Sequence, residues 1–421
     1  MPPALAPEQR LEIVDRYRKG ETLTVIARDL GIHYETARKW ARAGRRQGRQ
    51  AVAHRPRKPI GQLKGVPSEV VACLLQLREQ HPSWGVPYLR EQLLRHPQLS
   101  QQQQAQVPSQ STLYRFLRSH EDRVPRVPLK SKVPTTPLLR QVCHPHHMWQ
   151  MDLKEKCRLE GLDCQVTVAN VRDVYSSVTV GAVVFALSRR NATLCGADMQ
   201  DACRECFSTW GLPDILRTDK GTCFMGNFAQ TSFPSAFTLW LAGLDVKHET
   251  IAKGKVTQNG CVERFNRTYN NLVLHDGPFD NIEQVRNLSQ CTIDFLNRCC
   301  PSRAGSCQGL APLIAHPTAQ QPRRLYQPEC EHELFDLRRV DSYLAGFGWQ
   351  RRTDMVGKVS LANHDYYVGK ANKGRVFDVS FDPTDRSFCL KTPDGEVELR
   401  RPAVGLDAQH LTNIRKNPRG G

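Results

Sequence analysis

The feature that most constrains the fold is a change of pattern near residue 146. Three strand-like runs come first, at residues 148–157, 165–171 and 178–186. A helical pattern at 192–210 then alternates with strand-like runs at 214–218 and 246–251 and with helical patterns at 233–243 and 281–299. Three strands in a meander followed by alternating helices and strands predict an α/β domain with a mixed sheet over residues 146–315.

A second constraint is the polar helical stretch at residues 258–271. Steps of three and four residues place four polar side chains on one helical face: Glu263, Asn266, Arg267 and Asn270. The opposite, buried side is predicted to consist of Val262, Phe265, Tyr269 and Leu272. One acid among donors is typical of a metal ligand beside a polyanion. A solvated face with a Glu263–Arg267 pair is the alternative, and this stretch alone leaves both open.

Length and charge restrict the class of protein. A chain of 421 residues is too long for one compact core, so we expect several domains. Lys plus Arg number 59 against 42 Asp plus Glu, a formal net charge of +17. An excess of this size favours a polyanionic partner, most commonly nucleic acid.

The cysteines and the hydropathy indicate a reducing, aqueous compartment. Fifteen cysteines are scattered through apolar segments, and we identify no secretory signal, so reduced thiols are expected. Cys203 and Cys206 have the spacing of half a zinc site, but they lie in a helical pattern without a matching second pair, which predicts core cysteines. No run is long enough to span a membrane. We expect a soluble, cytoplasmic, nucleoid-associated protein.

The N-terminal residues 7–48 have the pattern of a small DNA-binding unit. Three short helices are predicted, with a tight turn at Gly31 before a basic third helix, which is the helix-turn-helix arrangement. The candidate DNA contacts are Thr36, Arg38, Lys39, Arg42, Arg45 and Arg46. An ordinary three-helix bundle is the alternative, but the Arg-rich run that continues into a predicted linker at 43–63 favours DNA. The unit resembles the N-terminal DNA-binding module of many transposases and resolvases.

A second helical unit is predicted at residues 64–119. Ser68 and Ser109 are candidate N-caps, and the glutamines at 101–104 are expected to form a loop. Thr112 and Arg115 on the last helix are candidate DNA contacts. The order His-Pro-Ser-Trp-Gly-Val, helix, Ser-Thr-Leu-Tyr-Arg-Phe-Leu is similar to the second helix-turn-helix of insertion-sequence transposases. A helical spacer is the alternative.

Three further segments complete the domain organisation. Residues 120–145 are rich in Pro and basic residues and are predicted to be an extended linker. An irregular connector at 312–339 leads to short alternating runs at 345–411, which predict a small antiparallel barrel followed by a disordered tail at 412–421. The basic residues of the barrel are expected to contact phosphates or another subunit: Lys358, Lys370, Lys373 and Arg375.

Three acids are the candidate catalytic residues. Asp152 lies on the first strand of the α/β region, Asp219 at the end of a later strand, and Glu263 on the polar helix. Acids at neighbouring strand ends and on a flanking helix can converge at one edge of a sheet. Oxygen ligands suit Mg²⁺ or Mn²⁺. Two such ions about 4 Å apart activate an attacking oxygen and stabilise the leaving oxygen of an in-line displacement.

The contexts of these acids resemble those of the DDE transposase and retroviral-type integrase superfamily. The matching stretches are Trp-Gln-Met-Asp152, Arg-Thr-Asp219-Lys-Gly-Thr and Gln-Asn-Gly-Cys-Val-Glu263-Arg-Phe-Asn-Arg-Thr. The resemblance covers the central domain and implies an RNase H-like core that uses two divalent cations. Members of this superfamily cleave DNA at the ends of a mobile element and join the freed 3′-hydroxyls to target DNA.

Carried over by position, the resemblance makes Asp152, Asp219 and Glu263 the catalytic metal ligands. It assigns contacts with the DNA end to a mobile loop and its flank: Lys253, Lys255, Gln258, Asn259, Arg264 and Arg267. Two departures are visible. Lys220 stands where the family usually has Asn, and the interval between Asp219 and Glu263 is longer than usual, with 231–236 as the expected insertion.

These observations predict a bacterial DNA transposase that assembles as a homo-multimer on DNA. A phage-type integrase of the same chemistry and a domesticated, non-catalytic DNA-binding regulator are the alternatives, and the intact acid trio disfavours the regulator. The sequence leaves open the end sequence, the target, the oligomer number, the number of strands cut and the need for an accessory ATPase.

Overall fold

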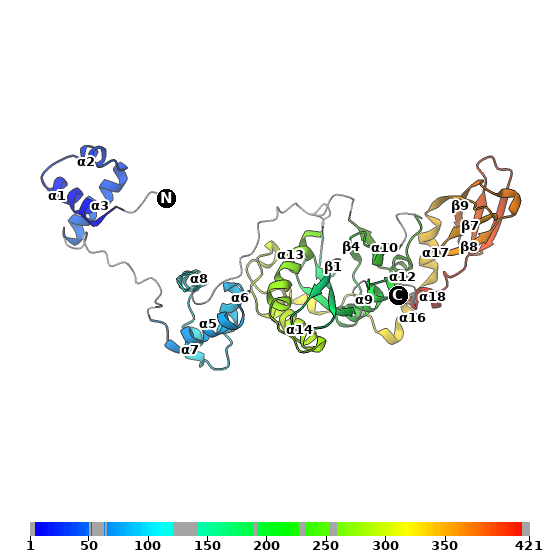
Figure 1. Cartoon of the computed structure of the whole chain (residues 1–421), viewed down its shortest axis with the longest axis horizontal. Coiled ribbons are helices and arrows are strands. Elements are labelled where there is room, and N and C mark those ends of the chain that lie inside the picture. Colours follow the sequence, from blue (N-terminus) through cyan, green and yellow to red (C-terminus); the bar gives the residue numbers. More distant parts are fainter. Residues whose placement is uncertain are drawn as a thin grey trace. The chain divides into compact units, whose positions relative to one another are not determined.

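The computed structural model describes residues 5–49, 52, 63, 65–120, 142–187, 192–226, 232–251 and 259–414 (Figure 1). The chain divides into two compact units, one formed by residues 1–71 with 108–125 and the other by 72–107 with 126–421. No helix among the described residues is long and apolar enough to cross a membrane.

The N-terminal three-helix prediction is confirmed. The helices are α1 (Pro7–Arg18), α2 (Leu23–Asp29) and α3 (Tyr34–Gln47). Their buried core is Ile13, Val14, Ile26, Ala27, Ala37, Trp40, Ala41 and Val52. Helices α1 and α3 pack closely at Gly44, where an added Cβ would lie 2.5 Å from a methyl carbon of Val14. Because α3 continues to Gln47, the predicted linker start at residue 43 is wrong.

Four helices follow in sequence. They are α5 (Ser68–Gln80), α6 (Val86–Leu93), α7 (Gln101–Ala105) and α8 (Gln110–Arg118). The predicted N-cap Ser109 is confirmed, since its side chain accepts a hydrogen bond from the backbone N–H of Thr112 at 3.4 Å. The predicted linker at 120–145 and the predicted tail at 412–421 lie largely outside the described residues, which include 142–145 and 412–414.

The glutamine run predicted to be a loop is instead the helix α7. The hydroxyl of Ser100 accepts the backbone N–H of Gln103 at 3.3 Å, and the side chain of Gln103 accepts the backbone N–H of Ser100 at 2.9 Å. This reciprocal capping box satisfies two helix-end donors and starts the helix.

The central domain is built on a five-stranded mixed sheet. Its strands are β1 (Met148–Arg158), β2 (Gln165–Asp173), β3 (Thr179–Leu187), β4 (Ile215–Thr218) and β5 (Lys247–Thr250). The order across the sheet is β3-β2-β1-β4-β5. Strands β1, β2 and β3 pair antiparallel, whereas β4 pairs parallel with both β1 and β5. The predicted meander and mixed sheet are confirmed.

Helices cover both faces of this sheet. They are α9 (Gly196–Trp210), α10 (Thr222–Met225), α12 (Ala236–Gly243), α13 (Gly260–Tyr269) and α14 (Ile282–Arg298), with a π-helix, η2 (Asn270–Leu274), between the last two. Trp149 and Met151 of β1 belong to one hydrophobic core with residues of α9 and α12. Gln150 and Asp152 alternate with them and therefore face α13 on the other side.

The C-terminal strands do not confirm the predicted closed barrel. The strands are β6 (Gly348–Arg352), β7 (Lys358–Leu361), β8 (His364–Tyr367), β9 (Val376–Asp382), β10 (Ser387–Lys391) and β11 (Glu398–Pro402). They form an antiparallel sheet in the order β11-β10-β9-β6 and a separate hairpin of β7 and β8. Trp349, Val359 and Phe388 join both sheets to the hydrophobic core that also contains residues of the central domain.

The predicted irregular connector contains several short helical elements. They are α15 (Pro312–Ala315), η4 (Pro317–Gln320), η5 (Pro328–Cys330), α16 (Glu331–Leu334) and the start of α17 (Leu337–Ala345). Three further short helices lie outside the connector: η3 (Gly305–Cys307), η6 (Lys370–Asn372) and α18 (Ala408–Thr412). Glu331 of α16 is buried and accepts hydrogen bonds from Arg204 of α9 at 2.8 and 2.7 Å and from Trp240 of α12 at 3.0 Å. The connector is therefore tied to the core through one carboxylate.

Glu331→Gln is expected to lower the free energy of unfolding by about 2–4 kcal/mol at pH 7, because Arg204 loses its ionic partner in a buried setting. Burial acts to raise the pKa of Glu331, but hydrogen bonds from Arg204, Tyr326 and Trp240 leave this pKa below its ordinary value. A depressed carboxyl pKa stabilises the fold above the unfolded-state pKa, and this stability is lost as the pH falls. Chemical denaturation should therefore separate the variant from wild type at pH 7 and bring the two together in acid.

Asp201→Asn is the matched control for this experiment. Asp201 also approaches Arg204, at 3.5 Å, but its side chain is 55% exposed. An exposed pair contributes about 0–1 kcal/mol, so this variant should stay close to wild type. Equal losses in the two variants would contradict the importance of the buried carboxylate.

Candidate active site

The two aspartates lie level with each other on neighbouring parallel strands. Strands β1 and β4 pair in the register Met148↔Ile215, Trp149↔Leu216 and Gln150↔Arg217. Two residues beyond the pair Gln150↔Arg217, Asp152 lies on β1 and Asp219 is the first residue after β4. Because neighbouring strands are about 4.8 Å apart, this register brings both acids to the same end of β4.

Asp152 is held by a hydrogen-bonded chain of amides. The side-chain N–H of Asn266, on α13, donates to Oδ2 of Asp152 at 2.5 Å. The side-chain oxygen of Asn266 in turn accepts from Asn170 at 2.6 Å, and Asn170 is the cross-strand partner of Asp152 on β2. The chain of contacts therefore fixes the carboxylate of Asp152 relative to both the sheet and α13.

Helix α13 begins on the side chain of Gln150. The side-chain oxygen of Gln150 accepts the backbone N–H groups of Cys261 at 3.1 Å and Val262 at 3.3 Å. These N–H groups lack partners within the helix, so a buried acceptor at this point fixes where α13 starts. Glu263 is the next residue, three before Asn266, and its position relative to Asp152 is set by these contacts.

The predicted two-sided character of α13 is confirmed. Val262, Phe265, Tyr269 and Leu272 are buried. The guanidinium carbon of Arg172, on β2, lies 5.2 Å from the ring centre of Phe265. Glu263 and Asn266 are half-buried on the other face. The helix thus contacts β2 through Phe265, and its Asn266 reaches Asp152 of β1 and Asn170 of β2.

The acids influence one another electrostatically. Burial, the carboxylate of Asp219 and the carboxylate of Glu263 together raise the pKa of Asp152 to about 6, against the hydrogen bond from Asn266 that lowers it. Burial also raises the pKa of Glu263. The region therefore concentrates negative charge whose repulsion a cation would relieve.

Asp219 occupies a tight turn at the end of β4. Its Oδ1 accepts the backbone N–H of Gly221 at 2.8 Å, and an added Cβ at Gly221 would lie 2.9 Å from this oxygen. Behind it, the hydroxyl of Thr218 bonds to His248 of β5 at 2.9 Å. Lys220, the departure noted in the sequence, is exposed.

The donor set suits hard divalent cations in kind, because all three candidate ligands are carboxylates. In the part of the chain that the structure describes, no three His, Cys, Asp or Glu side chains are already arranged to hold one ion. The β1–β4 register and the start of α13 at Gln150 bring the segments that carry the three acids to one region, but among the described residues they form no finished ligand cluster.

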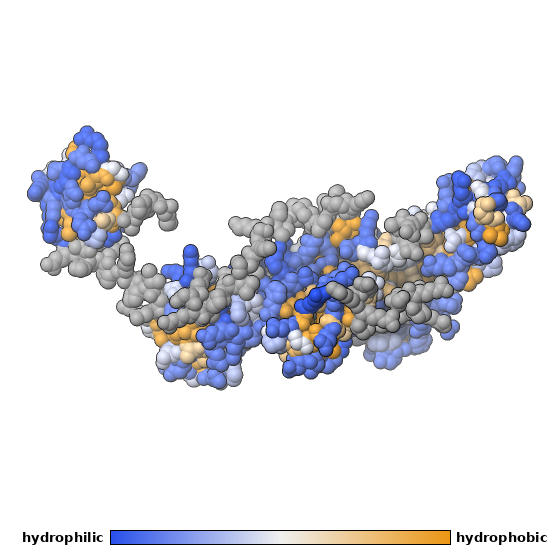
Figure 2. All heavy atoms as spheres, viewed as in Figure 1, coloured by the Kyte–Doolittle hydropathy of each residue, from blue (hydrophilic) through white to orange (hydrophobic). Residues whose placement is uncertain are grey.

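The predicted DNA contacts of the N-terminal unit lie on the outer side of α3. Arg38, Lys39, Arg42, Arg45 and Arg46 are exposed, and Thr36 is half-buried. Figure 2 shows that most of the visible surface of α1–α3 is hydrophilic. Sequence reasoning missed Tyr34, which is 44% exposed at the start of α3. Its place beside the basic face was the available signal.

On α8, Arg115 is exposed, whereas the hydroxyl of Thr112 bonds to Ser109 at 3.0 Å and is part of the N-cap. Tyr114, 46% exposed, was missed by the sequence reasoning. Two residues that fix the central site were also missed: Gln150 and Asn170. Both share a sheet face with Asp152, Gln150 by the two-residue period of the strand and Asn170 by cross-strand pairing.

The residues predicted to contact the DNA end have different positions. Lys253, Lys255 and Gln258 lie outside the described residues. Arg264 is exposed and Arg267 is half-buried. Asn259 is buried, and its side-chain N–H donates to the backbone oxygen of Met151 at 3.4 Å. In this structure Asn259 therefore supports the strand that carries Asp152, and a contact with DNA remains a prediction.

The prediction of core cysteines is confirmed for Cys203 and Cys206. Both are buried in the hydrophobic core on α9, and burial raises the pKa of each thiol. All fifteen cysteines are free thiols.

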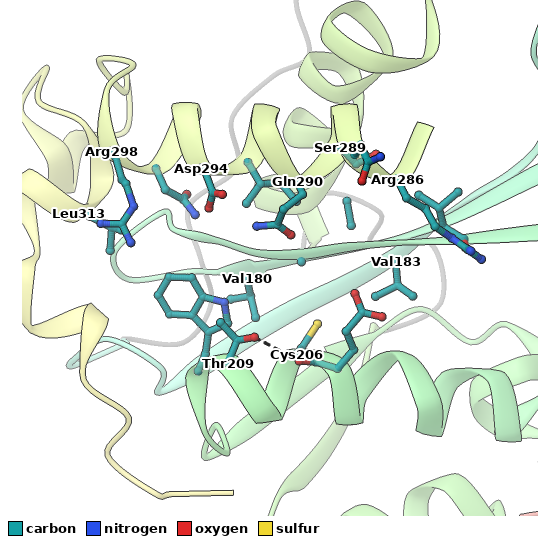
Figure 3. Close-up of a pocket in the computed structure, with 18 of the residues that line it drawn as sticks. Val180, Val183, Cys206, Thr209, Arg286, Ser289, Gln290, Asp294, Arg298 and Leu313 are labelled. Atoms are coloured by element: carbon teal, nitrogen blue, oxygen red, sulfur yellow. Dashed lines mark hydrogen bonds between the residues drawn. The ribbon is translucent and has the colours of Figure 1, made fainter. Parts of the chain in front are cut away.

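A separate cavity of about 630 Å³ lies at the edge strand β3, between α9 and α14 (Figure 3). Arg286 and Arg298 of α14 and Cys206 and Thr209 of α9 are among its lining residues. The three candidate catalytic acids are not part of its lining.

Comparison with known proteins gives two family matches. Residues 9–60 match a helix-turn-helix domain, and residues 244–298, which include α13 and Glu263, match an integrase core domain. No curated protein matches the chain.

Two solved structures illustrate the structural comparison. The integrase catalytic core domain of HTLV-2 in complex with magnesium is 20% identical, with 42% of this chain and 99% of that chain covered and a TM-score of 0.30. The intasome of simian T-cell lymphotropic virus in complex with the PP2A regulatory subunit B56 gamma is 13% identical, with 74% and 96% covered and a TM-score of 0.32. These scores add no argument. The chain therefore contains a helix-turn-helix domain at residues 9–60 and an integrase core domain at residues 244–298.

Proposed function

We propose that this chain is a DDE-type DNA transposase. It would cleave DNA at the ends of a mobile element and transfer the 3′-hydroxyls to target DNA. The observation that supports the proposal is the arrangement of the segments that carry the acids: Asp152 lies on β1, Asp219 directly follows the neighbouring parallel strand β4, and the helix with Glu263 starts at Gln150 of β1. The integrase core match over residues 244–298 supports the same chemistry.

Asp152, Asp219 and Glu263 would hold two Mg²⁺ or Mn²⁺ ions. Such a pair supplies activation of the attacking oxygen and stabilisation of the leaving oxygen. The raised pKa of Asp152 supports cation binding, because crowded carboxylates are more stable as anions beside a positive ion. Asn266 would keep the Asp152 carboxylate oriented towards the other acids through its hydrogen bond to Oδ2.

DNA binding would come mainly from the helix-turn-helix domain and from the net charge of +17. The exposed basic face of α3 would lie in a groove of the end sequence, with α8 as a second contact. Joining two ends in one event requires at least two active sites, so the proposed active form is a homo-multimer assembled on DNA.

Asp219→Asn is expected to lower strand transfer by more than about a hundredfold while leaving the affinity for the end DNA unchanged, because it removes a metal ligand and no element of the DNA-binding helices. A joining assay with Mg²⁺ and a parallel binding assay measure the two quantities. Asp245→Asn is the matched control: Asp245 is an exposed aspartate of the same domain at the N-terminal side of β5 and should behave as wild type.

Wild-type protein that binds the end DNA but never joins it would favour the non-catalytic regulator. Joining confined to a circular donor with a single attachment sequence would favour the phage-type integrase. Either result would replace the transposase proposal.

Asp152→Asn is expected to stabilise the metal-free protein at pH 7–8. The pKa of Asp152 is raised in the fold from 3.8 to about 6, so the folded state holds this proton more tightly than the unfolded state. Ionisation therefore costs stability, by about 3 kcal/mol once the pH is well above 6, and this cost disappears as the pH falls below 4. Denaturation in EDTA should show the variant more stable than wild type at pH 7.5 and equal to it near pH 4.

Magnesium is expected to raise the Tm of the wild type and to have a much smaller effect on the Tm of Asp152→Asn, because only the folded state carries the site. Differential scanning fluorimetry across Mg²⁺ concentrations measures this difference. An equal shift in both proteins would argue against Asp152 as a ligand.

A further inference from the structure

The helix that carries Glu263 has a second attachment, at its C-terminal end. Helix α13 continues without a break into the π-helix η2, because Asn270 at the junction keeps right-handed helical backbone angles. Any group that fixes η2 therefore fixes the axial position of α13. π-Helical turns are rare and are found frequently at functional sites.

Two side chains from the turn between α5 and α6 bind η2. The hydroxyl of Ser83 donates to the backbone oxygen of Asn271 at 2.5 Å. The ring of His81 lies 2.5 Å, from Nδ1 to Oδ1, from Asp276, two residues beyond the end of η2. One turn thus contacts both the body and the C-terminal end of the π-helix.

This turn is itself held rigidly. His81 stacks on Trp84 with ring centres 3.6 Å apart and an interplanar angle of 4°. The backbone oxygen of Pro82 accepts the guanidinium of Arg78 at 2.8 Å, and Arg78 is buried. Trp84 packs edge-on against Tyr88 of α6, which packs edge-on against Phe295 of α14 at 4.8 Å. A stacked ring pair with a buried arginine permits little movement of Ser83.

The contacts connect α13, α14, α6 and the His81–Trp84 turn in a continuous series. Tyr269, in the last turn of α13, bonds through its hydroxyl to Ser289 of α14 at 2.5 Å, and α14 carries Phe295. Helix α13 is therefore fixed by Gln150 at its start and by α6, α14 and the His81–Trp84 turn at its end. Without the contacts at its C-terminal end, α13 would be held only by Gln150 at its start and could change its orientation about that point.

We propose that His81 and Ser83 are positioning residues for catalysis, acting through η2 to set the position of Glu263. The proposal rests on the proposed metal-dependent function. The segment between the two predicted DNA-binding helices of the N-terminal half is then a structural part of the catalytic unit. Neither residue needs to touch metal or DNA.

The test compares Ser83→Ala and His81→Ala with Tyr88→Phe. The hydroxyl of Tyr88 bonds to Gln92 of α6 and Thr292 of α14, so Tyr88→Phe removes these contacts but keeps the ring that packs on Trp84 and Phe295. We expect Ser83→Ala and His81→Ala to lower joining about 10- to 100-fold or to raise the Mg²⁺ concentration for half-maximal joining by a similar factor, with unchanged end binding. Tyr88→Phe should stay within about twofold of wild type.

A double-mutant cycle tests the route of action. If His81 acts through Asp276, the double variant His81→Ala with Asp276→Ala should be no worse than the more impaired single variant. Additive losses would overturn this route, and so would an effect confined to DNA binding or equal activity in Ser83→Ala and Tyr88→Phe.

A measurement that does not depend on DNA joining, the Mg²⁺-dependent rise in Tm, distinguishes this proposal from the proposed function. The Mg²⁺-dependent rise in Tm should be smaller in Ser83→Ala than in Tyr88→Phe, whether or not the wild type joins DNA. If the wild type shows this rise but no joining, the transposase proposal fails and the positioning proposal stands on the Tm difference. If the rise is the same in Ser83→Ala and Tyr88→Phe, or is absent from wild type, the positioning proposal fails.

Discussion

The placement of the whole candidate site depends on one buried glutamine side chain. Gln150 is fully buried and gives its oxygen to two N–H groups at the start of α13. A helix end without such a partner leaves buried donors unsatisfied, at a cost of about 1–3 kcal/mol each. The contact therefore selects one docking position for α13 on β1, two residues from Asp152. Asn266 and Asn259 reinforce the same position from the helix side. The spacing of two of the three acids follows from these amides.

The repulsion between the acidic side chains opposes the contacts that place them near one another. Amide contacts bring Asp152 and Glu263 together, and the β1–β4 register adds Asp219, so the fold gathers negative charge in a half-buried region. Repulsion of this kind persists only where the surrounding structure holds the groups in place. The neutral amides of Asn170 and Asn266 orient an acid without neutralising it, which keeps the region suited to cations.

Local sequence patterns predicted what is locally encoded. Strand alternation located β1 to β5, and the contexts of Asp152, Asp219 and Glu263 made these acids the candidate ligands, which remains a prediction. Contacts between distant segments could not be predicted from local patterns, because their partners are far apart in the sequence. Gln150 and Cys261 are 111 residues apart, and His81 and Asp276 are 195 residues apart. The predicted small barrel is not confirmed for the same reason, since strand runs do not specify which strands pair. The missed helix α7 differs, because its Ser100–Gln103 capping box is visible in the sequence.

The three acids are held in unequal ways, and this inequality bears on how the site is completed. Asp152 is bonded to α13 through Asn266, and the start of this helix at Gln150 places Glu263 on the same element. Asp219 is placed by strand register and by its own turn, where Oδ1 is engaged by the N–H of Gly221. Any movement of the Asp219 carboxylate would have to break this local contact, whereas the contacts of Gln150 and Asn266 with α13 do not involve the turn. In the proposed site, the position of Asp219 would thus depend on its own turn and the position of Asp152 on α13.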